Sequence, residues 1–199
     1  MSTVIHSAQG ALFDAADGLP QGLTLAPTFI DAAEEHALLE VAATLPLHEA
    51  RYKQYTARRR VFAYGSRADY EEDRLRPVPI GGLPAALHRL RERLAAWVGV
   101  APEEFVHVMI AQYQKGTPLG WHRDAPYYEL VCGVSLGSPA RLRFRPWPPR
   151  DPKKEDIVAI ELAPRSAYAM RGAARWGWQH SVPPVPRLRH SVTMRTARN

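Results

Sequence analysis

An alternation of apolar and polar residues through the second half of the chain constrains the fold most strongly. The segment FVHVMIAQY, which begins at Phe105, places Val106, Val108 and Ile110 on one face if it is extended. The same period of two continues through ELVCGVSL, ARLRFRP, DIVAIEL, SAYAM and RHSVTMR. Short alternating segments separated by turn residues are typical of antiparallel sheets. The second half is therefore expected to be a mostly antiparallel β structure.

The first half has helical periodicity instead. In TFIDAAEEHALLEVAATLPL, Asp31 is a suitable N-cap, and Glu34 and Glu35 follow in the first turn, which predicts a helix from about Asp31 to Leu45. In GGLPAALHRLRERLAAWVGV, apolar residues recur every three or four positions, which predicts a second amphipathic helix ending near Gly99. The whole chain thus reads as an α+β protein whose helices come from its first half.

Length and composition indicate one ordinary globular domain. The chain has 199 residues, of which 46% are hydrophobic and 23% charged, so a core of normal size is expected. No stretch approaches 18 apolar residues, which argues against a membrane span. The N-terminus lacks a basic leader and a long apolar core, so a cytoplasmic, monomeric protein is the expectation.

Cysteine content and charge narrow the chemistry. Cys132 is the only cysteine, so an internal disulfide and the cysteine-based zinc patterns are excluded. Any metal site must then use histidines and carboxylates. The net charge of +6 favours an anionic partner such as nucleic acid, although many basic proteins bind none specifically.

The segment GWHRDAPYYEL contains two possible metal ligands. On a strand, His122 and Asp124 would point to the same side, offering an imidazole and a carboxylate, which suit Fe, Mn or Zn. The best third ligand is His180 in RWGWQHSV. Two histidines and one carboxylate are the ligand set of non-haem Fe(II) oxygenases. Taken alone, a His-x-Asp pair is common, and an ordinary structural histidine is the simpler interpretation.

RHSVTMR near the C-terminus supplies a second set of polar groups. At period two, Arg189, Ser191, Thr193 and Arg195 share one face. A solvated face would make the arginines an ordinary charged edge, whereas a face that lines the metal cavity would bind a small dicarboxylate, because Arg binds carboxylates bidentately. With Tyr113, this set would fit 2-oxoglutarate.

Tyr113, the His122-Arg-Asp124 motif, VSLGSPARLRF, His180 and RHSVTMR, in this order, resemble the AlkB family of Fe(II)/2-oxoglutarate-dependent dioxygenases over about residues 52 to 198. The resemblance implies Fe(II), 2-oxoglutarate and O2 as cofactor and cosubstrates. It further implies that His122, Asp124 and His180 hold the iron, and that Tyr113, Arg189, Ser191, Thr193 and Arg195 form the cosubstrate site.

The resemblance also implies the architecture. The expected fold is a double-stranded β-helix, or jelly roll, at residues 105–199, buttressed by N-terminal helices. Residues 1–50 would form an extension and a helix, and residues 51–75 a nucleotide-recognition lid, all within a single AlkB-like domain. In the lid, aromatic faces would stack bases and arginines would bind phosphates. The candidate substrate residues are Arg59, Arg60, Tyr64 and Tyr70, with Trp121 and Arg175 outside the lid.

The activity implied is oxidative demethylation of N-alkylated bases in DNA or RNA, with release of formaldehyde, succinate and CO2. Ala111 and Ser191 stand where the founding bacterial enzyme has asparagines, and Pro126 where it has a base-contacting aspartate, so the cosubstrate contacts and the base preference must differ. RGAARWGWQH and RRVFAYG are more similar to the tRNA-modifying branch, which makes tRNA hydroxylation an alternative. A small-molecule or protein hydroxylase and a non-catalytic nucleic-acid-binding jelly roll also remain open.

Two other patterns suggest different functions. GVSLG matches the G-x-S-x-G nucleophile elbow around Ser135, with Asp156 and His180 following in the order of α/β-hydrolases. The elbow requires a helix after the serine, but a proline and an alternating strand follow here. In ARLRF, Arg141, Arg143 and Arg145 would share one strand face, where they could contact a nucleic-acid backbone or simply be solvated.

Overall fold

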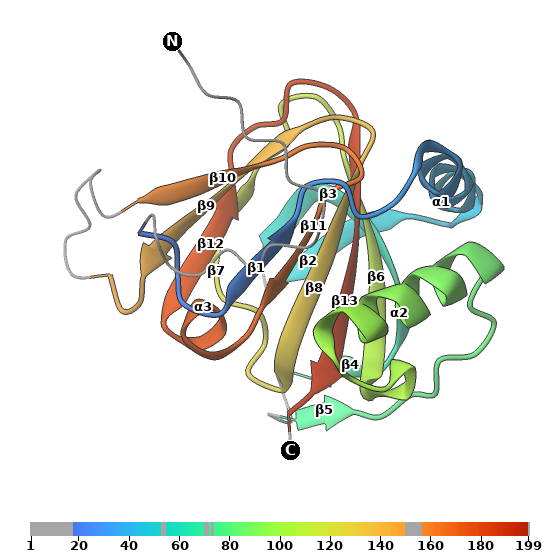
Figure 1. Cartoon of the computed structure of the whole chain (residues 1–199), viewed down its shortest axis with the longest axis horizontal. Helices are drawn as coiled ribbons and strands as arrows, with labels where there is room; N and C mark the ends of the chain where they lie inside the picture. The colour runs from blue at the N-terminus through green and yellow to red at the C-terminus, as the bar shows by residue number, and fades with distance from the viewer. Residues whose placement is uncertain (1–17, 53–54, 70–71, 73, 150–156, 199) are drawn as a thin grey trace, which may run out of the picture.

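Two antiparallel sheets face each other, and two helices pack on the outside of the larger one (Figure 1). The protein is represented by a computed structural model, which describes residues 18–52, 55–69, 72, 74–149 and 157–198. The larger sheet has the strand order β1-β11-β8-β13-β6-β3-β2, the smaller has the order β10-β9-β12-β7, and β4 and β5 form a separate hairpin. This arrangement confirms the α+β jelly-roll fold expected from the sequence.

The seven-stranded sheet is assembled from both halves of the chain. Its strands, in chain order, are β1 (Leu23–Ala26), β2 (His48–Tyr52), β3 (Tyr55–Gly65), β6 (Phe105–Tyr113), β8 (Tyr128–Leu136), β11 (Ala167–Met170) and β13 (Arg189–Ala197). The smaller sheet contains β7 (Leu119–His122), β9 (Ala140–Pro146), β10 (Val158–Leu162) and β12 (Trp178–Val182). The hairpin pairs β4 (Arg67–Asp69) with β5 (Arg74–Arg76).

The two long helices form where the periodicity predicted them. Helix α1 (Ala32–Thr44) begins at the N-cap Asp31, whose side chain accepts a hydrogen bond from the Glu34 amide while the Glu34 side chain accepts one from the Asp31 amide. Helix α2 (Ala85–Val98) ends at Gly99, whose φ of 72° is a left-handed conformation that glycine adopts without steric cost. The short helices η1 (Pro102–Glu104) and α3 (Gly172–Trp176) precede β6 and β12.

The alternation of each strand sorts its side chains between two cores. Val108, Ile110, Val192 and Met194 of the seven-stranded sheet pack with residues of α1 and α2 in one buried cluster. The intervening residues face the four-stranded sheet, where a second cluster joins Ala111, Tyr113 and Val131 to Leu142, Phe144 and Leu162. Burial of these apolar faces stabilises the fold at roughly 25 cal/mol per Å². Polar residues on the second face are thereby enclosed between the sheets.

Strand register brings distant residues into the space between the sheets. In the smaller sheet, His180 of β12 lies opposite both His122 of β7 and Phe144 of β9. In the larger sheet, Arg189 of β13 lies opposite Tyr113 of β6. The two histidine candidates therefore come from one sheet and the cosubstrate candidates from the other.

Ser135 does not form a nucleophile elbow. It lies inside β8, and the chain turns at Gly137, whose φ is 82°, before it continues as strand β9. The following element is a strand and not a helix, which excludes the α/β-hydrolase reading. Among the described residues, no helix is long and apolar enough to cross a membrane.

Candidate metal and cosubstrate site

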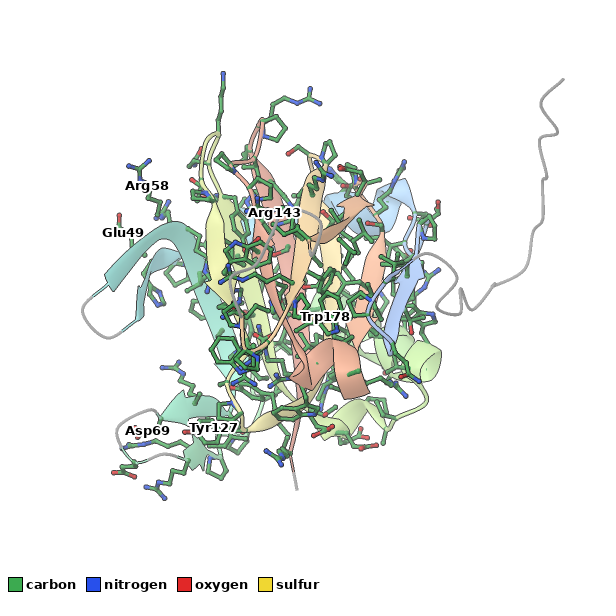
Figure 2. The ribbon with its side chains drawn as sticks, turned by 90° about the vertical axis from the view of Figure 1, so that its left-hand side faces the viewer. Glu49, Arg58, Asp69, Tyr127, Arg143 and Trp178 are labelled. Atoms are coloured by element: carbon green, nitrogen blue, oxygen red, sulfur yellow. The ribbon has the colours of Figure 1, made fainter. Side chains whose placement is uncertain are left out.

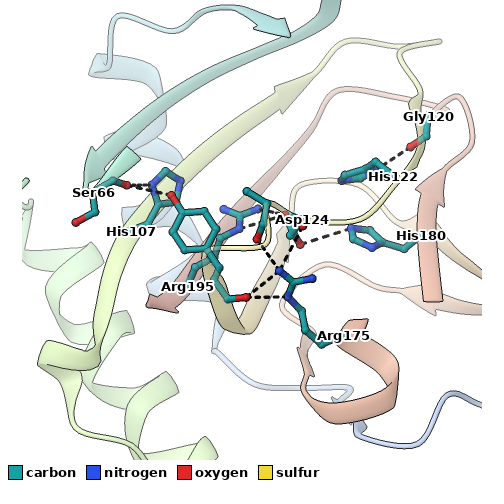
Figure 3. Close-up of polar contacts among 10 residues, drawn as sticks. Ser66, His107, Gly120, His122, Asp124, Arg175, His180 and Arg195 are labelled. Atoms are coloured by element: carbon teal, nitrogen blue, oxygen red, sulfur yellow. Dashed lines mark hydrogen bonds and ion pairs between the residues drawn. The ribbon is translucent and has the colours of Figure 1, made fainter. Parts of the chain in front are cut away.

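His122, Asp124 and His180 bring their ligand atoms together, each within 4.8 Å of the others (Figure 3). His122 is the last residue of β7, and His180 is the middle residue of β12. The two rings are neighbours, with centroids 4.2 Å apart. Asp124 lies in the loop after β7 and not on the strand itself, which differs from the simple alternation that predicted this pair.

Both imidazoles are set up as neutral ligands. The Nδ1 atom of His122 lies 2.9 Å from the Gly120 carbonyl oxygen, so Nδ1 carries the proton and Nε2 keeps its lone pair. Burial lowers the pKa of His122, and it lowers the pKa of His180 to about 3, with the neighbouring ring of His122 adding to the effect. Two unprotonated nitrogens therefore face the same point near neutral pH.

The two carboxylate oxygens of Asp124 have different surroundings. Oδ1 accepts hydrogen bonds from Arg195, at 2.8 Å from Nη2 and 3.2 Å from Nε. Oδ2 is buried without a hydrogen-bond partner and lies 3.8 Å from His180 Nε2. Burial raises the pKa of Asp124, but Arg195 and then the two histidines outweigh this effect, so the net pKa is well below the usual range. The ionised carboxylate thus presents one free oxygen toward the imidazoles.

This donor set fits a divalent iron ion. A buried polar atom without a partner is costly, and a metal bound to Oδ2 and to the two imidazoles would remove that cost. Two histidines and one carboxylate suit Fe(II) and leave open positions on one side of the metal. The chemistry of the donors and the unpartnered oxygen both support a metal at this position.

Arg175 holds the loop that carries Asp124. It lies on α3 and is 3% exposed, and its guanidinium donates to the carbonyl oxygens of Ala125 at 2.7 Å, Tyr128 at 2.8 Å and Asp124 at 3.3 Å. The guanidinium also lies over the Trp176 ring. The sequence predicted Arg175 as a substrate contact, but the structure occupies its guanidinium with backbone carbonyls. Its role here is to position the loop.

A second cationic group lies on the inner face of the larger sheet. The Arg189 guanidinium lies 5.1 Å from the centre of the Tyr113 ring, and its Nε donates to the Ser135 hydroxyl at 3.2 Å. Both Arg189 and Tyr113 are almost fully buried. Ser191 and Thr193 follow at alternate positions of β13 and are also buried. Within the described residues, no carboxylate pairs with Arg189, which suits it to an anionic ligand.

Tyr168 also lies at this site, although no sequence pattern singles it out. It lies opposite Gly133 across β11 and β8, and a Cβ atom at Gly133 would lie only 2.3 to 2.6 Å from the end of the tyrosine ring. The end of the ring thus occupies the space beside the glycine that a side chain would fill. Burial raises the pKa of Tyr168, and the charges of Asp124, Arg195 and Arg189 all act on it. The absence of a side chain at Gly133 therefore leaves room for Tyr168 on the inner face of the sheet.

His107 and Tyr128 close the other side of Arg195. The Ser66 carbonyl oxygen accepts from Tyr128 Oη at 3.1 Å and lies 2.8 Å from His107 Nδ1 (Figure 3). Burial and then the positive charge of Arg195 lower the pKa of His107 to about 4. His107 is thus neutral at ordinary pH, and its proton on Nδ1 bonds to the backbone. Sequence reasoning missed both residues because their contacts with Ser66 and Arg195 depend on how distant segments pack.

The remaining substrate candidates are distributed over several surfaces. Arg59 lies close enough to the metal-ligand candidates that its charge contributes to the lowered pKa of His122, after burial and the effects of nearer groups. Arg60 instead donates to the Leu47 carbonyl oxygen at 2.7 Å, and Tyr64 packs against the helix-side core beside Phe62. The structure therefore does not bring Arg60 or Tyr64 to the three ligands. Tyr70 lies outside the described residues.

Trp121 also lies away from the ligands. It precedes His122 on β7, so its side chain is on the outer face of the four-stranded sheet. There the guanidinium groups of Arg143 and Arg145 lie 5.0 and 4.6 Å from its ring centre. The expected shared face of Arg143 and Arg145 is thus present, with Trp121 on it.

Comparison with known proteins identifies the family. The family model of the 2OG-Fe(II) oxygenase superfamily matches residues 22–198. An Arabidopsis thaliana protein named alkylated DNA repair protein ALKBH8 homolog is 27% identical over 94% of this chain. An uncharacterised protein, L905, of Acanthamoeba polyphaga mimivirus is 33% identical over 39% of the chain. The chain corresponds to only 58% and 36% of the lengths of these two relatives.

Solved structures agree on the fold. OsALKBH1 superposes with a TM-score of 0.67 at 12% identity, over 89% of this chain and 99% of that one. A Pseudomonas putida prolyl-4-hydroxylase superposes with a TM-score of 0.63 at 15% identity, over 89% of this chain and 93% of the other. The family model matches most of the chain, and two histidines and an aspartate converge between the sheets, so the chain belongs to the 2OG-Fe(II) oxygenase superfamily of dioxygenases, which use Fe(II), 2-oxoglutarate and O2.

Proposed function

We propose that the protein removes alkyl groups from nitrogen atoms of nucleobases in DNA or RNA. For a methyl group, the overall reaction takes one 2-oxoglutarate and one O2, and it yields formaldehyde, succinate, CO2 and the unmodified base. One oxygen atom enters succinate, and the other enters the methyl group, which leaves as formaldehyde when the hemiaminal C–N bond breaks. O2 is the oxidant, and bound iron together with 2-oxoglutarate would supply the chemistry that activates it.

The observation that carries the proposal is the convergence of two sites between the sheets. His122, Asp124 and His180 form the site suited to iron. Arg189 lies beside Tyr113, and no carboxylate of the described residues pairs with it. Arg189 would bind the distal carboxylate of 2-oxoglutarate, with Ser135 fixing the plane of its guanidinium. Arg195 would fix Asp124 through Oδ1 and leave Oδ2 for the metal. The protein's residues thereby orient the reactants and exclude water.

Three observations support nucleic acid as the substrate class. The chain carries a net charge of +6, which favours a polyanion. Arg59 adds a positive charge near the candidate iron ligands, where it would attract a phosphate next to the reacting base. The relative with the longest match carries a name that refers to repair of alkylated DNA.

The test is product release from the anaerobically iron-loaded protein after addition of O2 and 2-oxoglutarate. The substrates are N-methylated DNA and RNA oligonucleotides, a tRNA and a proline-containing peptide. Formaldehyde in step with loss of the methyl mark is the expected result and identifies the base. Succinate with a product that gains one oxygen and no formaldehyde would instead indicate a hydroxylase, and the substrate that gains it would name the class.

A further inference from the structure

The outer face of the four-stranded sheet carries a cluster of cationic and aromatic side chains. Arg143 and Arg145 extend from β9 across β12, where their Nε atoms donate to Ser181 Oγ at 3.1 Å and to Gln179 Oε1 at 2.8 Å. Both guanidinium groups end over the ring of Trp121 on β7. This cluster, together with Arg123 and Trp147, is called the outer-face cluster below.

The arginines of the cluster are held in place by buried residues beneath them. Its two anchoring residues, Ser181 and Gln179, are 0% and 9% exposed, so the arginine stems are fixed on a buried base. Each arginine uses Nε for its anchor and rests on an indole ring, so the terminal nitrogens are directed by both contacts. Arginines fixed in this way lose little conformational entropy when they bind a ligand.

Among the described residues, one arginine of this face has a carboxylate partner and three have none. Arg141 on the same face of β9 lies 3.6 Å from Glu161, in a pair whose side chains are both more than half exposed. No carboxylate within the described residues pairs with Arg123, Arg143 or Arg145. Helices α1 and α2 pack on the other sheet, and Arg143 lies on the side of the molecule that faces the viewer in Figure 2. A polyanion is the partner that such a face complements.

The aromatic members indicate unpaired bases. Trp147, which follows β9, is 39% exposed, and the Arg123 guanidinium lies 4.7 Å from its ring centre. An exposed indole beside fixed arginines combines a stacking surface with phosphate binding, the pairing that single-stranded nucleic acids require. A duplex keeps its bases stacked on each other and would leave the indole unused.

The cluster is continuous with the candidate metal site. Trp121, His122, Arg123 and Asp124 are consecutive, and their side chains alternate between the outer-face cluster and the iron-binding candidates. Arg123 also donates to the Trp176 carbonyl oxygen at 3.3 Å, which ties the cluster to the helix that carries Arg175. A strand bound on this face would therefore lie close to the edge of the sheet where the ligands are.

We propose that the outer-face cluster binds single-stranded nucleic acid that flanks the substrate base, through phosphate contacts to the arginines and base stacking on Trp147. This inference rests on the proposed function for its substrate class. It adds a binding surface outside the space between the sheets, and a dependence of affinity on substrate length.

The experiment compares a methylated trinucleotide with a methylated oligonucleotide of about 12 nucleotides, a length within the site sizes of single-strand-binding folds. Affinity is measured by fluorescence anisotropy over a range of salt concentrations, and KM by formaldehyde release. The variants are R143Q/R145Q, W147A and the charge-preserving R143K/R145K. R89Q/R187Q is the matched control, because it removes the same charge from two exposed arginines elsewhere. Thermal unfolding checks that each variant is folded.

We expect R143Q/R145Q to weaken binding of the long oligonucleotide at least tenfold and to reduce the salt slope by about 1.4, the value for two lost single-strand phosphate contacts. W147A should weaken binding about fivefold or more with little change in the slope. R143K/R145K should keep most of the slope, and R89Q/R187Q should resemble the wild type. The KM for the trinucleotide should change far less than that for the long substrate.

The outcomes separate the two proposals. If R143Q/R145Q binds the long oligonucleotide as R89Q/R187Q does, the surface is wrong even though demethylation stands. If the wild type releases no formaldehyde from any substrate but R143Q/R145Q alone loses binding, the surface stands and the demethylase assignment fails. If the wild type binds the long oligonucleotide no better than the trinucleotide, the arginines on Trp121 serve only to stabilise the open sheet face, and the proposal is overturned.

Discussion

The two carboxylate oxygens of Asp124 have different roles: one bonds to the protein, and the other is left for a metal. Its Oδ1 is bonded to Arg195, whose guanidinium is itself enclosed between His107 and Tyr128. Its Oδ2 remains buried without a partner. Burial alone would lower the pKa of Arg195 and raise the pKa of Asp124, which favours the neutral form of each. Their ion pair outweighs burial and keeps both groups charged. Arg195 is therefore expected to act on the metal through Asp124.

This division predicts different effects for the two arginines of β13. We expect R195Q to weaken metal binding about 10- to 100-fold, because a residue that orients a ligand is lost. R189Q should leave metal binding nearly unchanged and raise the Kd for 2-oxoglutarate by tenfold or more, because a charge-assisted contact is lost. Metal titration and cosubstrate titration of each purified variant give the comparison. Equal loss of metal affinity in both would remove the distinction.

Gly133 and Tyr168 form a steric pair that can be tested directly. G133A would place a methyl group within 2.6 Å of the Tyr168 ring, so the ring must move and cosubstrate affinity should fall. The double variant G133A/Y168A should recover most of the free energy of unfolding that G133A loses. Unfolding by denaturant and 2-oxoglutarate titration check the two effects. Additive losses in the double variant would show that the ring does not occupy this space.

At the scale of elements, the alternation of side chains between the two faces of a strand decides which sequence predictions agree with the structure. The alternation in β6, β8 and β13 placed the buried and inward-facing residues correctly, because each of these strands separates two different cores. Neighbouring residues of a strand point to opposite faces, so Trp121 and His122 lie on opposite faces of β7, and Arg60 and Arg59 on opposite faces of β3. Naming both neighbours as substrate contacts overlooked this rule. The role of Tyr168 required the register between β11 and β8, which no local pattern contains.

Loops were less predictable than strands. Asp124 lies beyond the end of β7, and its position depends on Arg175, which comes 51 positions later and donates to three carbonyls of this loop. Hydrogen bonds from a distant side chain to backbone carbonyls leave no periodic signal in a sequence. The family resemblance identified Asp124, but the reason for its placement emerges only from the folded chain.

Arg175 supplies the prediction that belongs to this loop. R175K keeps the charge but cannot bond three carbonyls in one plane, so it should lower the free energy of unfolding by about 2 kcal/mol or more and weaken metal binding. D31A is the matched control, because losing a helix cap should cost about 1 kcal/mol without changing metal affinity. Denaturant unfolding and metal titration measure both quantities. Unchanged metal affinity in R175K would show that the loop holds Asp124 without it.

At the scale of the whole molecule, the enclosed polar groups make stability depend on pH. The pKa of His107 in the folded protein is about 4, below the value of about 6.5 for an unfolded chain. Between these values only the unfolded state binds the proton, so its contribution to stability is present above about pH 6.5 and is lost as the pH falls toward 4.

The metal-free protein should therefore lose stability on acidification, by up to about 1.4 kcal/mol per pH unit from this residue. H107Q can still donate to the Ser66 carbonyl but cannot ionise, so its stability should fall less steeply between pH 6.5 and 4. Denaturant unfolding at several pH values checks the slope. Parallel curves for H107Q and the wild type would show that His107 does not titrate in this way.

The most direct test of the site is the anaerobic addition of Fe(II) and 2-oxoglutarate, followed by the visible charge-transfer absorption that arises when both bind together. With His122, Asp124 and His180 as ligands and Arg189 as the cosubstrate anchor, the wild type should develop this absorption with one iron per chain. D124A should develop none, and R189Q should need a higher concentration of 2-oxoglutarate. Full absorption in a folded D124A variant would contradict the site.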